Sequence, residues 1–199
     1  MPDTPPPRSA VVVAHGFKGF KDWAFFPYLA ERLAAAGHAA ITFNFSGSGV
    51  VGGSDDHMVL EAFARNTLSA ELEELGLIVD LARQGDLLPR PPRAVGVLGH
   101  SRGGGTAILH AGGRGGVDAL VTWSAVASFD RWSEETKQEW RERGRIYALN
   151  TRTGRQLPLN VGLLHDFERN RDRLDVRRWA SQVQAPWLMM SWQGVSIRL

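Results

Sequence analysis

A serine with glycines on both sides is the feature of this sequence that most directly indicates chemistry. The segment Gly99-His100-Ser101-Arg102-Gly103 has the spacing Gly-x-Ser-x-Gly, and two further glycines follow it. In such a segment a buried strand turns sharply into a helix and leaves the serine hydroxyl at the tip of the turn. The glycines leave room for the turn, and the helix N-terminus directs free N–H groups toward developing negative charge. We therefore predict that Ser101 is a nucleophile.

The surroundings of this segment decide between a nucleophile and an ordinary glycine-rich turn. The chain contains 22 glycines, so the spacing alone is weak. Residues 94–98, however, form an apolar run typical of a buried strand, and residues 101–111 are predicted to form a helix. An earlier apolar run, residues 10–14, ends at His15-Gly16. Because the serine lies where a strand becomes a helix, we favour the nucleophile.

Strand and helix patterns alternate along the chain around this motif. Short apolar runs predict strands at residues 10–14, 39–45, 94–98, 119–123 and 186–190. Three- and four-residue spacing of apolar side chains predicts helices at residues 28–36, 60–83, 101–111 and 174–183. This alternation predicts an α/β fold with a mainly parallel sheet flanked by helices.

One segment interrupts the alternation. Residues 129–173 are rich in Arg, Trp and Glu, and we predict that they form a lid-like insertion over the end of the sheet. The turn at residues 150–154 resembles the turn of a known kind of lid hairpin. Acidic residues alternate with the basic ones, which favours a solvated lid with many ion pairs over a nucleic-acid-binding face.

Composition limits the remaining possibilities. We expect one domain at residues 10–199 behind a disordered, Pro-rich N-terminus at residues 1–9. A net charge of +2 gives no reason to expect a nucleic-acid partner, and no apolar run is long enough for a membrane span. We also expect no metal and no cofactor, because no His, Asp and Glu cluster has suitable spacing and the loop at residues 47–54 lacks the lysine of a phosphate-binding loop. A cytoplasmic protein is the simplest interpretation.

The order of these elements resembles the α/β-hydrolase fold over nearly the whole chain. The residues that carry the resemblance are His15-Gly16-Phe17 after the first strand, the glycine-rich segment at residues 43–49 after the second, and the Ser101 motif. Small bacterial serine hydrolases of the dienelactone-hydrolase-like and serine-aminopeptidase-like kind are the most similar group. The resemblance implies an acyl-enzyme at Ser101 and an oxyanion hole formed by the backbone N–H groups of Phe17 and Arg102. It also implies a small-molecule or peptide acyl substrate containing an ester, thioester or amide.

The sequence departs from the family where the catalytic acid and histidine are expected. No acidic residue follows Asp175 and no histidine follows His165, and residues 191–199 look foreign to the family. We expect that the last strand and helix are missing through truncation or a frameshift, and that catalysis is impaired. A non-catalytic hydrolase-fold binding protein, or a truncated remnant, is the alternative.

A rebuilt triad would need substitutes for the missing groups. His165 has the right position in the chain order, His57 is a second choice of base, and Asp130 is a candidate acid after the fourth strand. We favour simpler roles: packing or solvent exposure for His165, and a helix N-terminal role for Asp130.

Overall fold

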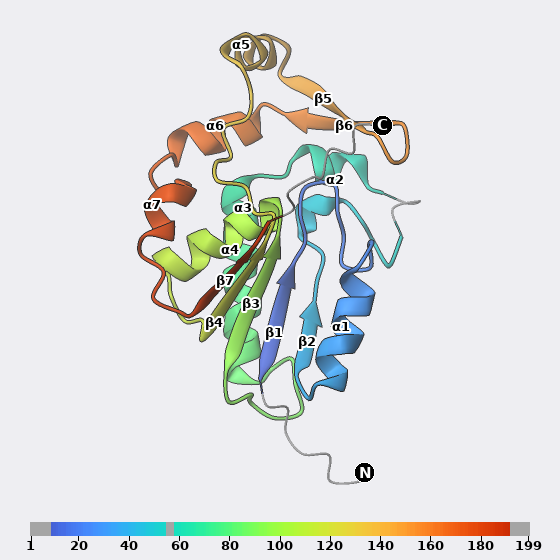
Figure 1. Cartoon of the computed structure of the whole chain (residues 1–199). Helices are drawn as coiled ribbons and strands as arrows, with labels where there is room; N and C mark the ends of the chain where they lie inside the picture. Colours follow the sequence, from blue (N-terminus) through green and yellow to red (C-terminus); the bar gives the residue numbers. More distant parts are fainter. Residues whose placement is uncertain (1–8, 55–57, 192–199) are drawn as a thin grey trace, which may run out of the picture.

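A five-stranded parallel sheet lies at the centre of the computed structural model, which describes residues 9–54 and 58–191 (Figure 1). Its strands, in spatial order, are β2 (Ala39–Thr42), β1 (Ala10–Ala14), β3 (Val95–His100), β4 (Ala119–Trp123) and β7 (Trp187–Met190). Every neighbouring pair is parallel, with Val12 aligned to Ile41 on one side and to Val97 on the other. The predicted α/β class is confirmed.

Helices cover both faces of the sheet because successive strand residues point to opposite sides. Val12 and Val97 belong to the larger core, against α3 (Leu68–Gln84) and α4 (Arg102–Gly113). Val13 and Leu98 instead pack with Phe26 of α1 (Phe26–Ala35) on the opposite face (Figure 1). The continuous apolar runs in the strands therefore supply two separate cores.

Three predicted elements differ from the structure. The single helix expected at residues 60–83 is two helices, α2 (Leu60–Ala64) and α3, because Thr67 adopts an extended conformation and accepts a hydrogen bond from the Ala70 N–H at 3.2 Å. The second strand stops at Thr42, before a 3-10 turn, η1 (Ser46–Ser48). The helix expected at residues 174–183 forms only as α7 (Val176–Ala180), capped by Asp175.

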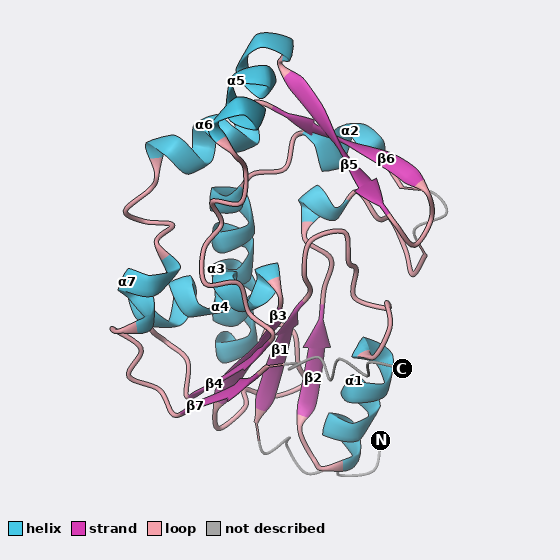
Figure 2. Cartoon of the chain, turned by 45° about the horizontal axis from the view of Figure 1, so that its top comes forward, coloured by secondary structure: helices cyan, strands magenta, loops and turns pink. Residues whose placement is uncertain are grey.

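The insertion, residues 129–173, lies beyond the carboxyl ends of the strands (Figures 1 and 2). It contains α5 (Glu134–Arg143), the antiparallel hairpin of β5 (Arg145–Asn150) and β6 (Arg155–Asn160), and α6 (Gly162–Arg169). The hairpin crosses α2, as Figure 2 shows. Trp140 is fully buried and its Nε1–H donates to the Leu159 carbonyl at 2.8 Å. The predicted hairpin turn at residues 150–154 is confirmed.

The two ends of the described chain meet the sheet differently. Ser9 is held beside β2, where its carbonyl accepts from the Ala39 N–H and its hydroxyl shares a hydrogen bond with His38. Among the described strands, β7 pairs with β4 alone, and the side chains of Leu188 and Met189 are exposed. Most of the segment that departs from the family pattern, residues 192–199, lies outside the described residues. Within the described part of the chain, no helix is both long and apolar enough to cross a membrane.

Candidate active site

Ser101 occupies a strained position between β3 and α4. Its backbone has φ 54° and ψ −117°, in the region that costs a non-glycine residue about 1–3 kcal/mol. Hydrogen bonds hold it there: its N–H donates to the Trp123 carbonyl at 2.9 Å, and its own carbonyl accepts from Gly104 at 3.1 Å. The Val126 N–H, from the loop after β4, also donates to that carbonyl at 3.1 Å. The turn expected at Ser101 is therefore present and fixed from both neighbouring segments.

Gly99 and Gly103, on either side of Ser101, must be glycines because neighbouring backbone atoms leave no room for a side chain. A Cβ at Gly99 would lie 2.6 Å from the Gly104 Cα, and one at Gly103 would lie 2.5 Å from the Ala14 carbonyl oxygen. Because all these neighbours are main-chain atoms of buried elements, no rotamer change could relieve the overlap. The spacing Gly-x-Ser-x-Gly is thus needed because α4 lies so close to β1 and β3.

The turn after β1 lies directly against the serine. A Cβ at Gly16 would be 3.0 Å from the Ser101 Cβ, so the two segments are in contact. Among the described residues, the backbone N–H groups of Phe17, in this turn, and of Arg102, at the start of α4, have no hydrogen-bond acceptor. Free N–H groups beside a serine are the arrangement that stabilises an oxyanion.

His15 braces this turn, as expected from the sequence. Its Nδ1–H donates to the Gly16 carbonyl at 2.9 Å, and its Nε2 accepts from the Phe45 N–H at 3.1 Å. Burial lowers the pKa of His15 from its ordinary value of 6.5 to about 4, so the ring is neutral at pH 7. Both nitrogens are already engaged, which leaves His15 a structural role.

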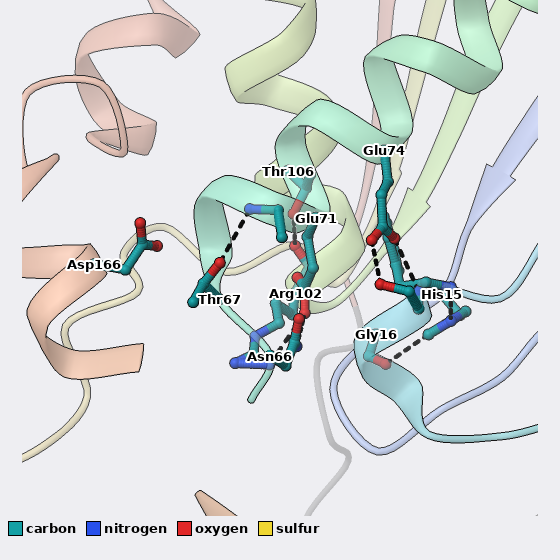
Figure 3. A network of polar contacts seen from close by, with 12 residues as sticks. His15, Gly16, Asn66, Thr67, Glu71, Glu74, Arg102, Thr106 and Asp166 are labelled. Atoms are coloured by element: carbon teal, nitrogen blue, oxygen red, sulfur yellow. Dashed lines mark hydrogen bonds and ion pairs between the residues drawn. The ribbon is translucent and has the colours of Figure 1, made fainter. Parts of the chain in front are cut away.

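The Arg102 side chain belongs to a buried polar network with Glu71 and Asn66 (Figure 3). Its guanidinium lies 3.4 Å from the Glu71 carboxylate and 4.3 Å from the centre of the Phe17 ring. The Asn66 amide donates to the same Glu71 oxygen at 2.6 Å. Burial raises the pKa of Glu71, while Arg102 and Asn66 act in the opposite direction.

The sequence analysis missed Glu71 and Asn66. Glu71 lies three residues after Leu68 and four before Leu75, both buried, so helical spacing alone could have placed its carboxylate on the inner face of the helix. Asn66 has no comparable signal, because it lies in the break between α2 and α3 that the sequence did not reveal.

A cavity of about 290 Å³ opens beside Phe17 and Arg102. It extends from the turn after β1 and the start of α4 to the first part of the insertion. Its lining consists of Phe17, Lys18, Leu68, Arg102, Val126, Phe129, Arg131 and Trp132. The Lys18 ammonium donates to the Leu149 carbonyl at 2.9 Å, which ties the turn after β1 to the hairpin of the insertion. Ser101 does not line the cavity itself, but its neighbour Arg102 and Phe17 do, and the cavity is large enough for a small molecule.

The candidate substitute base, His165, and the candidate substitute acid, Asp130, have neighbours other than Ser101. His165 is exposed on α6, while its neighbour Asp166 accepts from the Ser69 N–H at 2.9 Å at the start of α3. Asp130 forms an ion pair with Lys137 at 2.8 Å. Within residues 9–54 and 58–191, the Ser101 hydroxyl has no hydrogen-bond partner. His57 lies outside the described residues, and the described residues contain no cluster suited to a metal ion.

Known proteins share this architecture. Est1E from Butyrivibrio proteoclasticus, solved with bound ferulic acid, superposes with a TM-score of 0.67 at 20% identity over 94% of this chain and 70% of its own. A hydrolase from Agrobacterium vitis S4, whose function is itself only inferred, gives a TM-score of 0.68 at 16% identity over 96% of this chain and 83% of its own. These likenesses support the α/β-hydrolase fold.

Sequence comparison identifies the family. The 2,6-dihydropseudooxynicotine hydrolase of Paenarthrobacter nicotinovorans is 26% identical over 153 residues, which is 75% of this chain and 38% of that protein. The chain therefore spans about two fifths of the length of this curated relative. The profile of the dienelactone hydrolase family matches residues 1–148. With the fold and the serine turn, this match shows that the chain belongs to the dienelactone hydrolase family, within the α/β-hydrolase superfamily.

Proposed function

We propose that this protein is a serine hydrolase whose nucleophile is Ser101 and whose substrate is a small-molecule or peptide ester, thioester or amide. The observation that carries the proposal is the strained Ser101 turn beside the N–H groups of Phe17 and Arg102, which have no acceptor among the described residues; both residues also line the cavity. Membership of a hydrolase family supports it.

The proposed chemistry is acyl transfer. The Ser101 Oγ attacks the carbonyl carbon of the substrate, and the carbonyl oxygen takes up negative charge. The N–H groups of Phe17 and Arg102 donate to this oxygen. The tetrahedral intermediate then expels the alcohol, thiol or amine, and water later releases the acyl group from Ser101. The apolar side of the cavity, with Phe129 and Trp132, would hold the acyl or leaving group.

The proton acceptor for Ser101 is not assigned to a described residue. An oxyanion hole and substrate binding alone contribute about 10³- to 10⁴-fold over water, far less than a full triad. We therefore propose slow acylation by this 199-residue chain. The same observation favours the second candidate function, a non-catalytic binding protein that retains the cavity.

A fluorophosphonate probe tests the first proposal. Incubation of the chain with the probe, followed by peptide mapping, is expected to find the phosphonyl group on Ser101 and none in Ser101→Ala. The same test on a longer member of the family shows whether the nucleophile position holds there as well. Absence of labelling in both proteins would refute the assignment of Ser101.

Ester turnover separates the two candidate functions. Hydrolysis of p-nitrophenyl acetate that is lost in Ser101→Ala would rule out the non-catalytic protein. Ligand binding to the cavity without any Ser101-dependent turnover would support it.

A further inference from the structure

Arg102 is unusual for a residue in the first turn of a helix, because its side chain is buried rather than directed to solvent. Only 8% of Arg102 is exposed, and its partner Glu71, on α3, is 5% exposed. Transferring charges out of water is costly, and a buried ion pair recovers that cost only with good geometry and further hydrogen bonds. The Asn66 amide supplies one such bond to Glu71, at 2.6 Å.

The same guanidinium also stacks on an aromatic ring. Its carbon lies 4.3 Å from the centre of the Phe17 ring, within the range of a cation–π contact. Arginine can pair with a carboxylate and stack on a ring at once because its charged group is planar, which lysine cannot reproduce. The Phe17 ring in turn packs on Phe63, with 5.5 Å between ring centres.

These contacts connect the two residues beside Ser101 whose backbone N–H groups have no acceptor in the described part of the chain. One N–H belongs to Arg102 itself, and the other belongs to the residue that its guanidinium touches. The connection runs between the turn after β1 and the start of α4. Glu71 of α3 holds it from a third side, as Figure 3 shows for Glu71 and Arg102. An oxyanion hole needs both donors at fixed positions, and misplacement by about 1 Å can cost about 100-fold in rate.

From this geometry we infer that Arg102 is a positioning residue: its side chain, held by Glu71 and Asn66, presses on Phe17 and fixes the spacing of the two oxyanion-hole N–H groups. The inference rests on the proposed function of Ser101 and goes beyond it. The Arg102 side chain contributes no atom to the reaction, since it acts only through the backbone that it holds.

A purely structural role of the Arg102–Glu71 pair and a positioning role predict different reactivities of Ser101 once the pair is replaced. Replacing a buried ion pair by apolar residues of similar volume is often neutral or stabilising. The double variant Arg102→Met/Glu71→Met should therefore fold about as well as the wild type under either account. Only a positioning role predicts that this well-folded variant reacts slowly at Ser101.

The experiment measures acylation of Ser101 by p-nitrophenyl acetate, followed by mass spectrometry of the intact chain. In this step the Oγ–carbonyl carbon bond forms, the bond to the phenolic oxygen breaks, p-nitrophenolate leaves and the hydroxyl proton passes to water. We expect the rate constant to fall about 10- to 100-fold in the double variant, with an unchanged melting temperature. Arg102→Lys should show a similar loss, because it keeps the charge without the stacked plane.

A second substrate reports on the oxyanion hole itself. In the thiono analogue of the ester, sulfur replaces the carbonyl oxygen and fits poorly between donors set for oxygen. The ratio of ester to thiono-ester rates should exceed one in the wild type and fall toward one in the double variant. A change in global stability would not alter this ratio.

The matched control is Arg83→Gln, which removes an exposed arginine paired with Asp118 at the opposite end of the sheet. It should leave both the rate and the ratio unchanged. Equal acylation rates and ratios in the wild type and the double variant would overturn the positioning role while leaving Ser101 as the nucleophile. Absence of Ser101 acylation in the wild type would instead overturn the proposed function, and this inference with it.

Discussion

The serine turn and the insertion are held together in contrasting ways. Around Ser101, backbone atoms of three segments approach so closely that Gly99 and Gly103 admit no side chain. In the insertion, a Cβ at Gly162 would meet no atom within 4 Å. Charged groups follow the same division: the Arg102–Glu71 pair is buried, whereas Arg141 and Glu168 form an ion pair at the surface of the insertion.

The serine turn is therefore held more rigidly by close contacts than the insertion is. Close main-chain contacts around the serine allow almost no substitution at Gly99 and Gly103, because close-packed interiors transmit strain. The insertion instead packs buried side chains such as Trp140, Leu164 and Phe167, and its surface carries exposed ion pairs, which tolerate changes in shape. We therefore expect mutations to affect the two regions very unequally.

The largest effect is expected from Gly103→Ala. Its methyl group would overlap the Ala14 carbonyl oxygen, so α4 would have to move away from β1. We expect a loss of about 3 kcal/mol or more in unfolding free energy, or no folded protein, together with loss of Ser101 labelling. Chemical denaturation and fluorophosphonate labelling measure the two effects.

Gly162→Ala in the insertion is the matched control. It adds the same methyl group at the exposed start of α6, where helix propensity favours alanine by up to about 1 kcal/mol. Stability should be unchanged or slightly raised. Equal destabilisation by the two substitutions would erase the contrast between the regions.

Trp140→Ala tests whether the insertion has a core of its own. The side chain is fully buried, stacks edge-on against Trp132 and donates to Leu159. Truncation of such a side chain costs about 3–5 kcal/mol. We expect rapid proteolysis within residues 129–173, measured by limited digestion, while fluorophosphonate labelling of Ser101 persists. If labelling were lost as completely as in Gly103→Ala, the turn and the insertion would form one cooperative unit.

Acid should weaken the sheet and its helices through two buried histidines. Burial lowers the pKa of both His15 and His110 to about 4, below the ordinary value of 6.5. The unfolded chain therefore binds more protons between these values, so stability is complete above pH 6.5 and is lost as the pH falls toward 4. Each histidine accounts for about 3 kcal/mol over that window.

His110→Leu isolates one of these contributions. Among the described residues, neither ring nitrogen of His110 has a hydrogen-bond partner, so the substitution should not weaken the protein at pH 7. Denaturation curves between pH 7 and pH 4 should show a loss about 3 kcal/mol smaller than in the wild type. Parallel pH profiles for the two proteins would contradict the assignment.

The smallest effect is expected from Arg141→Gln. The pair that it forms with Glu168 is partly exposed, and such pairs contribute at most about 1 kcal/mol and weaken with salt. Denaturation at low and high ionic strength should show a small difference that vanishes at high salt. A salt-independent loss of several kcal/mol would show that the insertion depends on its ion pairs as strongly as the serine turn depends on close packing.

Local sequence determined the sheet and the serine turn. The apolar runs at β1 and β4 give the strand bounds, and the glycines around Ser101 give the turn, because strand periodicity and backbone sterics act over a few residues. The turn of the insertion's hairpin was expected from its resemblance to a lid hairpin, and strands β5 and β6 were not predicted from apolar spacing. The break between α2 and α3 was not predictable either, since the apolar spacing continues across it.

Only the tertiary structure decided how the site is supported. Phe17, Asn66, Glu71 and Arg102 come from four segments, and no local pattern requires them to meet. The positions of His165 on an exposed helix surface and of Asp130 beside Lys137 were likewise set by packing of the insertion. The spacing of residues along the sequence predicts contacts within one element, whereas contacts between elements depend on how the whole chain packs.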